Sequence, residues 1–183
     1  MRDNHGDWRA HARAYREIRG RVLALGQTMG VQTTASVITL MRGDDMVAVP
    51  ASSTSAWAFE PTVLESGSNY CAEAVNAVDF ARATGPVRSV LSVHFPGDYG
   101  DDHAAGVKAA TAANGMTFIN IKTDPGADRQ SGAVDAILAR RPDLVVLAVN
   151  PAETAVIVQG AAAGGFPGRI IGAGPSWDPE LLR

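Results

Sequence analysis

From Ser89 onward, short apolar runs alternate with segments of helical periodicity, and this alternation restricts the possible folds more than any other feature of the sequence. It predicts strands at 89–93, 116–121, 144–149 and 170–171, with helices at 99–113, 130–140 and 151–164 between them. Strands that alternate with helices of this length form right-handed β–α–β crossovers and a parallel sheet. We therefore predict an α/β fold for this part of the chain.

The first part of the chain has the same kinds of element in a less regular order. The expected elements are an amphipathic helix at 8–20 capped by Asp7, a strand at 22–25, a helix at 33–41, a strand at 46–49 and a helix at 69–82. Gly85-Pro86 is the best candidate for a boundary, because the regular alternation begins after it. We therefore expect two domains, 1–85 and 86–183.

Composition excludes several classes of protein. The formal net charge of −3 gives no polyelectrolyte signature, so nucleic acid is not an expected partner. The single cysteine, Cys71, excludes an internal disulfide framework and a zinc site with several cysteines. No run reaches the roughly 18 apolar residues of a membrane helix, and the first residues lack the apolar stretch of a signal peptide. We expect no direct membrane insertion.

Ligands of open α/β sheets bind at the carboxyl ends of the strands, so the turns that follow the predicted strands are candidate sites. Four such turns stand out: Gly26–Gly30, the hydroxyl-rich segment Pro50–Ser55, the turn that leads to Tyr99, and Asn150-Pro151. Glycines let a ligand approach the backbone, hydroxyls can hold a carboxylate or an amide, and a tyrosine can cover a ligand. The simpler alternatives are a tight turn, an ordinary loop, a tyrosine packed on its own helix and a helix cap.

Evidence for catalysis is weaker. Asp98, Asp101, Asp102 and His103 suggest a metal cluster, but acidic residues in the first turn of a helix are favoured by the helix dipole, and Asp101 and Asp102 point to different faces. No GxSxG nucleophile motif is present, and Cys71 lies within a helical pattern where a small buried thiol is the ordinary outcome. We therefore predict no catalytic residue, no metal and no cofactor.

The order and spacing of the four turns resemble the type I periplasmic binding proteins, and more closely the leucine/isoleucine/valine-type substrate-binding proteins of ABC transporters. The segments that carry the resemblance are 25–30, 49–53, 98–100, 141–146 and 170–172, and 64–71 looks like a branch found in actinobacterial receptors of this kind. The resemblance implies two doubly wound parallel-sheet lobes that hold a small polar solute (an amino acid, an amide or a carboxylate) between them. It also implies an extracytoplasmic location and a membrane permease as partner.

Proteins of this family have roughly twice as many residues, so the resemblance also implies a fragment. Residues 1–85 would be a partial N-terminal lobe, and 86–183 a second lobe that is incomplete at its C-terminal end. In that case the strands at 22–25 and 46–49 lack their innermost neighbour and expose an apolar edge.

Matched residue by residue, the resemblance implies ligand contacts at Gly30, Ser52, Ser53, Tyr99, Asn150 and Gly174. The first turn and the hydroxyl-rich segment would hold the carboxylate of the solute, and Tyr99 would cover it from the other lobe. Gly30 stands where the family commonly has a serine. Gly174 stands where the family commonly has an acidic residue that neutralises an amino group, which argues against an α-amino acid as the ligand.

Two functions of other classes remain as alternatives. The effector-sensing domain of a transcription regulator shares the fold, but it would need a helix-turn-helix segment ahead of the sensor, and the helix at 8–20 is isolated. A small α/β enzyme would use His94, His103 and the neighbouring aspartates. Loss of activity on changing either histidine would distinguish the enzyme from a binding protein.

Overall fold

The computed structural model describes residues 3–182, and contacts between residues divide the chain into two compact units, Met1–Asn69 and Tyr70–Arg183. The division precedes α4 (Tyr70–Ala83), whereas the sequence suggested a boundary at Gly85-Pro86. The reason is that α4 packs along α5 (Asp98–Ala113), and this packing joins α4 to the second unit. Each unit is described below by itself.

The second unit is built on a four-stranded parallel sheet in the order β4-β3-β5-β6. Its strands are β3 (Ser89–His94), β4 (Thr117–Lys122), β5 (Leu144–Ala148) and β6 (Arg169–Gly172). Helices α5, α6 (Ser131–Arg140) and α7 (Pro151–Ala163) connect successive strands. These bounds lie close to the ranges predicted from the sequence, and the predicted α/β fold with parallel strands is confirmed.

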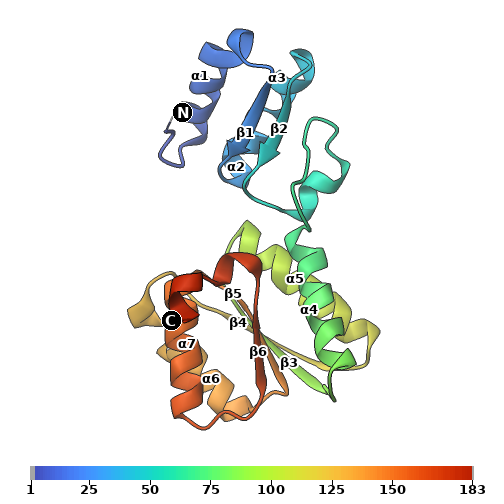
Figure 1. Cartoon of the computed structure of the whole chain (residues 1–183), viewed down its shortest axis with the longest axis vertical. Helices are drawn as coiled ribbons and strands as arrows, with labels where there is room; N and C mark the ends of the chain where they lie inside the picture. The colour runs from blue at the N-terminus through green and yellow to red at the C-terminus, as the bar shows by residue number, and fades with distance from the viewer. Residues whose placement is uncertain (1–2, 183) are drawn as a thin grey trace. The chain divides into compact units, whose positions relative to one another are not determined.

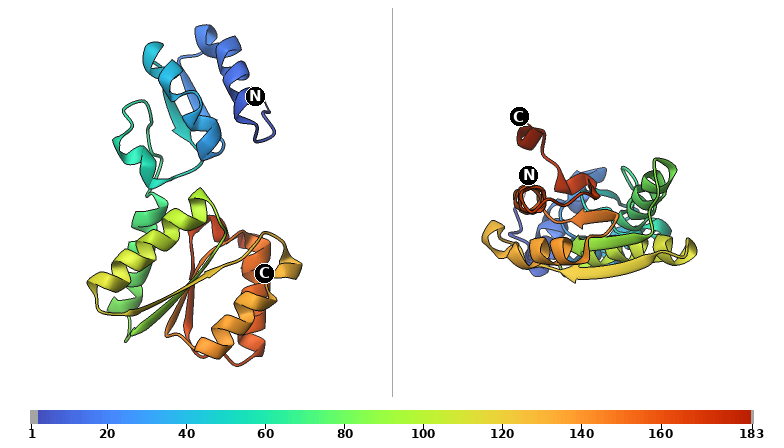
Figure 2. Two further views of the ribbon diagram at one scale, coloured as in Figure 1. Left: turned by 180° about the vertical axis from the view of Figure 1, so that it is seen from behind. Right: turned by 90° about the horizontal axis from the view of Figure 1, so that it is seen from below.

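Helices cover both faces of this sheet. In Figure 1, α4 and α5 lie on one face and α6 and α7 on the other, and the view from behind in Figure 2 shows the same two pairs. Alternate residues of the central strand β5 join the two cores: Val146 packs with α4 and α5, and Leu147 packs with α6 and α7. Every residue of β5 is fully buried, as expected for a parallel strand that is covered on both faces.

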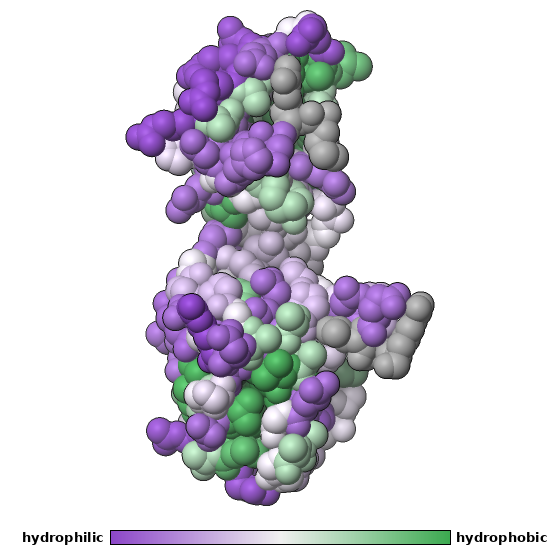
Figure 3. All heavy atoms as spheres, turned by 90° about the vertical axis from the view of Figure 1, so that its left-hand side faces the viewer, coloured by the Kyte–Doolittle hydropathy of each residue, from purple (hydrophilic) through white to green (hydrophobic). Residues whose placement is uncertain are grey.

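Helix α7 has an unusually apolar sequence for a surface helix. Its one charged residue is Glu153, which is buried, and alanines make up much of its exposed side. Figure 3 accordingly shows apolar side chains on the second unit, on the side that carries α6 and α7.

The first unit contains a two-stranded parallel sheet of β1 (Ala24–Thr28) and β2 (Val47–Pro50). Its helices are α1 (Trp8–Ile18), α2 (Val31–Ala35) and α3 (Ile38–Gly43). The predicted cap is confirmed, because the Asp7 side chain accepts hydrogen bonds from the backbone N–H groups of Arg9 and Ala10. Ala12 and Tyr15 of α1 are buried in the core of this unit with Leu25 of β1.

Two predictions for the first unit were partly wrong. The first strand begins at Ala24 instead of Val22, and Leu23 just before it is 98% exposed at the edge of the sheet. The helix predicted at 33–41 is two short helices that break at Ser36 and Val37. At the break the Ser36 hydroxyl donates to the carbonyl of Thr33, and this bonding competes with the regular helical pattern.

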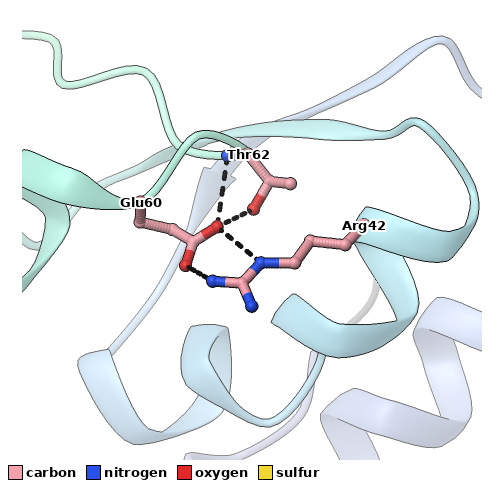
Figure 4. A network of polar contacts seen from close by, with 3 residues as sticks. All are labelled: Arg42, Glu60 and Thr62. Atoms are coloured by element: carbon pink, nitrogen blue, oxygen red, sulfur yellow. Dashed lines mark hydrogen bonds and ion pairs between the residues drawn. The ribbon is translucent and has the colours of Figure 1, made fainter.

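An ion pair fixes the segment that follows β2. The Glu60 carboxylate accepts hydrogen bonds from the Arg42 guanidinium and from the backbone N–H and hydroxyl of Thr62 (Figure 4). These donors, the Arg42 guanidinium first, lower the pKa of Glu60 below its usual range. Thr62 and Leu64 in turn bond to the backbone of Ala48, so this segment runs beside β2.

A close contact between α4 and α5 yields a test of the packing. A Cβ atom at Gly106 would lie 2.2 Å from the carbonyl oxygen of Cys71, so Gly106→Ala must push the helices apart. We expect a loss of about 1–3 kcal/mol in the free energy of unfolding, measured with urea. The control is Gly132→Ala in α6, where a Cβ meets nothing within 4 Å and alanine should stabilise by about 0.5–1 kcal/mol. Equal effects of the two changes would contradict this packing.

His103 of α5 yields a test of pH dependence. Its ring is fully buried, neither ring nitrogen has a hydrogen-bond partner among the described residues, and burial lowers its pKa to about 4. The unfolded chain takes up this proton near pH 6.5 and the folded chain only near pH 4, so stability falls as the pH falls through this window. Between about pH 7 and about pH 4.5, His103 should cost the folded chain about 2–3 kcal/mol of unfolding free energy. We expect urea unfolding of His103→Leu to show a pH dependence that is smaller by this amount.

The control for this pH series is His5→Gln, because His5 is exposed beside Asp3. This variant should keep the pH dependence of the original chain. The same pH dependence in the His103 variant and the original chain would show that His103 does not carry the effect.

Candidate functional site

The topology of the second unit places three of the predicted site residues at one edge of its sheet. Tyr99 follows β3, Asn150 follows β5 and Gly174 follows β6, and these three strands are neighbours in the parallel sheet. The carboxyl ends of parallel strands meet at the same edge, where ligands of open α/β sheets bind. Tyr99, Asn150 and Gly174 therefore belong to one edge, which we call the carboxyl edge.

Tyr99 is fixed at the carboxyl edge by two contacts. Its ring lies edge-on against the ring of Tyr70 of α4, with the centroids 4.8 Å apart. Its hydroxyl lies 3.2 Å from the hydroxyl of Ser176, in the turn Gly174–Ser176 after β6. Tyr99 therefore has contacts beyond its own helix.

The direction of the Tyr99–Ser176 hydrogen bond follows from the other partner of Ser176. The Ser176 oxygen lies 3.0 Å from the carbonyl oxygen of Leu147, and a carbonyl oxygen can only accept. The single hydroxyl proton of Ser176 is donated there, so Tyr99 must donate to Ser176. The phenol oxygen of Tyr99 thus keeps its lone pairs for another donor. Burial, together with the negative charge of Glu73, raises the pKa of Tyr99 well above its usual range, so the phenol stays neutral.

Gly174 contacts a carboxylate from a distant part of the chain. Its backbone N–H donates to Glu73 Oε1 of α4 at 2.6 Å. A Cβ atom at position 174 would lie 3.3 Å from the same oxygen, closer than ordinary contact. The glycine therefore lets the carboxylate approach the backbone.

Asn150 stands at the N-cap position of α7, but its side chain makes no capping hydrogen bond and is exposed. The Asn150 side chain therefore does not cap α7. Three residues later, Glu153 Oε1 accepts from the backbone N–H of Gly126 at 2.7 Å, and Oε2 is buried without a partner among the described residues. Glu153 thereby holds the connection that follows β4.

In the first unit, the two predicted turns are joined to each other. The backbone N–H of Ala51 donates to the carbonyl of Thr28, which ties the end of β2 to the end of β1. Gly30 has a φ of 84°, and a Cβ there would lie 2.9 Å from the Thr33 hydroxyl, so this position favours glycine. Gln27, three residues before Gly30, has a φ of 54° at an irregularity in the strand pairing. Left-handed non-glycine residues of this kind cluster at functional sites.

Ser52 and Ser53 are both half-buried in the segment after β2. The carbonyl of Ser52 accepts from the indole N–H of Trp57 at 3.0 Å, which holds the backbone in place. The Ser52 hydroxyl oxygen is buried without a hydrogen-bond partner among the described residues. A buried hydroxyl in this state is costly, so it is well suited to accept or donate a bond to a bound molecule.

The histidines that an enzyme would need are inside the protein. His94 is 1% exposed, and its ring nitrogens lie within hydrogen-bond distance of the Phe95 carbonyl and the Asn120 side chain. Asp101 accepts from the backbone N–H of Gly97 and pairs with Lys122 at 2.7 Å, so it acts at the start of α5. Within residues 3–182, no group of three or more His, Cys, Asp or Glu side chains is arranged to hold a metal ion.

Several residues at these two places were not predicted as site residues. Tyr70, Glu73 and Ser176 meet Tyr99 and Gly174, and Gln27 precedes Gly30. One signal for Tyr70 and Glu73 exists, because they stand three positions apart at the start of a helix and so share a face. Nothing in the sequence pattern indicates which strand end that face meets.

Comparisons with known proteins agree on one family. The family profile described as periplasmic binding protein matches residues 1–183. A fatty acid ABC transporter substrate-binding protein from Thermomonospora curvata has a TM-score of 0.86 at 23% identity, over 99% of this chain and 47% of that one. A branched-chain amino acid ABC transporter protein from Thermus thermophilus with bound valine has a TM-score of 0.86 at 16% identity, over 99% and 49%.

A solute-binding protein from R. palustris in complex with benzoate has a TM-score of 0.77 at 14% identity, over 97% of this chain and 51% of that one. The chain thus spans about half the length of these structures. No curated protein matches the sequence. The described part of the chain contains no helix that is both long enough and apolar enough to cross a membrane.

The contact between Glu73 and Gly174 can be tested by a double-mutant cycle. Gly174→Ala should displace the carboxylate from the amide and lower the free energy of unfolding by about 1 kcal/mol, the scale of one hydrogen bond. In a Glu73→Ala background, Gly174→Ala should lower the free energy of unfolding much less, because no carboxylate is left to displace. Urea unfolding of the four proteins measures the coupling. Additive effects would show that the two residues do not interact.

Proposed function

Since the chain belongs to the type I periplasmic binding protein family, we propose that it forms part of the extracytoplasmic solute-binding component of an ABC importer. Its solute would be small and polar: an amino acid, an amide or a carboxylate. Its protein partner would be the membrane permease of the transporter. The observation that carries this proposal is the meeting of Tyr99, Gly174 and Asn150 at the carboxyl edge of the second unit.

The chemistry of the carboxyl edge supports binding of a solute without covalent chemistry. Ser176, the hydroxyl nearest to Tyr99, donates its proton to a backbone carbonyl and not to a base, so it is not set up as a nucleophile. Tyr99 is held neutral by burial. Aromatic side chains held by their neighbours, with a few polar atoms free to bond, are typical of small-molecule sites.

The family resemblance also implies ligand contacts in the first unit. We propose that Gly30, Ser52 and Ser53 also contact the solute. Their support is the positive φ of Gly30 and the unpartnered hydroxyl of Ser52. The regulator alternative receives no support from α1, because Ala12 and Tyr15 make that helix part of the core of the first unit.

Tyr99→Ala tests the proposed site. In a thermal-shift screen of amino acids, amides and small carboxylates, followed by calorimetry on any solute that binds, the substitution should weaken binding by about 1–3 kcal/mol, the scale of a buried aromatic contact. The control is Phe80→Ala, which removes a largely exposed aromatic ring of α4 and should leave the affinity unchanged. Unchanged affinity in the Tyr99 variant would remove this residue from the site.

Ser52→Ala tests the first unit separately. The change removes one hydroxyl that has no partner among the described residues, so the stability of the chain should hardly change. Affinity for the same solute should fall by about 0.5–1.5 kcal/mol if this hydroxyl bonds to it. A loss of stability with no loss of affinity would assign Ser52 a structural role.

A further inference from the structure

We infer that the solute carries a cationic hydrogen-bond donor, such as a protonated amine, and that Glu73 is the residue that selects it. The inference rests on the proposed function, because it concerns the same carboxyl edge. It adds a specificity-determining residue that lies outside the six positions predicted from the sequence. Three observations carry it: the hydrogen-bond acceptors that remain free around Tyr99, the charge of Glu73 and the absence of a side chain at Gly174.

The donors that lie next to the Tyr99 hydroxyl and the Glu73 carboxylate are used within the protein. The Ser176 proton goes to the Leu147 carbonyl, the Tyr99 proton goes to Ser176, and the Gly174 N–H goes to Glu73. Two acceptors beside them keep free capacity: the phenol oxygen of Tyr99, and the second carboxylate oxygen of Glu73, which accepts no hydrogen bond from the described residues. A solute group that brings donors is therefore complementary to these two acceptors.

The charge of Glu73 points the same way. Its side chain is half-buried, and within residues 3–182 no Lys, Arg or His lies within ion-pair distance of it. The one lysine at the end of β4, Lys122, pairs with Asp101 instead. A partly buried carboxylate without a cation attracts one.

The structure also reverses an argument based on the sequence. The absence of an acidic side chain at position 174 argued against a solute with an amino group. In the structure, Gly174 instead receives the carboxylate of Glu73 at its backbone N–H, and a side chain at 174 would crowd it. The negative charge is present at this strand end and comes from α4.

The test uses the whole 183-residue chain and three pairs of solutes that differ in the amine. The pairs are L-leucine with 4-methylpentanoate, L-phenylalanine with 3-phenylpropanoate, and benzylamine with benzyl alcohol. In calorimetric titrations, the amine of at least one pair should bind about tenfold or more tightly than its partner, the scale of one charge-assisted hydrogen bond. Glu73→Gln should reduce that preference about tenfold or more.

Glu73→Gln is the informative variant because its amide oxygen can still accept from the Gly174 N–H, so the fold is retained while the charge is lost. Circular dichroism and the melting temperature verify that the variant is folded. The control is Asp79→Asn, which removes one negative charge from the exposed side of the same helix, where Asp79 forms an ion pair with Arg82. This control should leave the amine preference unchanged.

The outcomes separate the two proposals. Tighter binding of the amine-free members, or an amine preference that survives in Glu73→Gln, would overturn this inference and leave the proposed function intact. An equal loss in the Asp79 control would also overturn it, because the effect would then come from overall charge. Failure of all six solutes to bind would count against the proposed function itself, and the inference would fall with it.

Discussion

The burial of β5 on both faces is the constraint on which the second unit depends. A strand whose residues are all buried is covered on both faces, here by helices, and each helix that connects two successive strands returns the chain to the same end of the sheet. These helical crossovers make the strands parallel and place every strand-to-helix turn at one edge. Tyr99, Asn150 and Gly174 are neighbours in space because of how the core is packed, although they are far apart in the chain.

The same core sets the hydrogen bonding at that edge. The carbonyl of Leu147, in the buried strand β5, takes the proton of Ser176, and this determines that Tyr99 donates its own proton. The close contact between Gly106 of α5 and the backbone of Cys71 brings α4 against α5, which places Tyr70 and Glu73 beside the start of α5. The polarity of the proposed site therefore follows from contacts of the core and not from the loop alone.

Much of this architecture is visible in the sequence, because hydrophobic periodicity and turn residues are local signals. The strands and helices after Gly85 were predicted close to their observed bounds, and Tyr99 was expected at a strand end. What failed depends on interactions that periodicity does not contain. The break at Ser36 comes from side-chain bonds to the backbone, and the left-handed conformation of Gln27 comes from an irregular strand pairing. Glu73 was missed because its partner, Gly174, lies 101 positions away.

Gly174 shows why a residue-by-residue comparison can mislead about charge. Compared by side chain alone, position 174 lacks the acidic group that the family commonly has there. Its surroundings supply one, because the backbone N–H of Gly174 holds the carboxylate of Glu73, and a Cβ at position 174 would crowd that carboxylate. The charge at position 174 is therefore interpreted from Glu73 and Gly174 together. A strand end can therefore carry a negative charge that comes from another element, here Glu73 of α4, because the packing of the helices brings α4 to the end of β6.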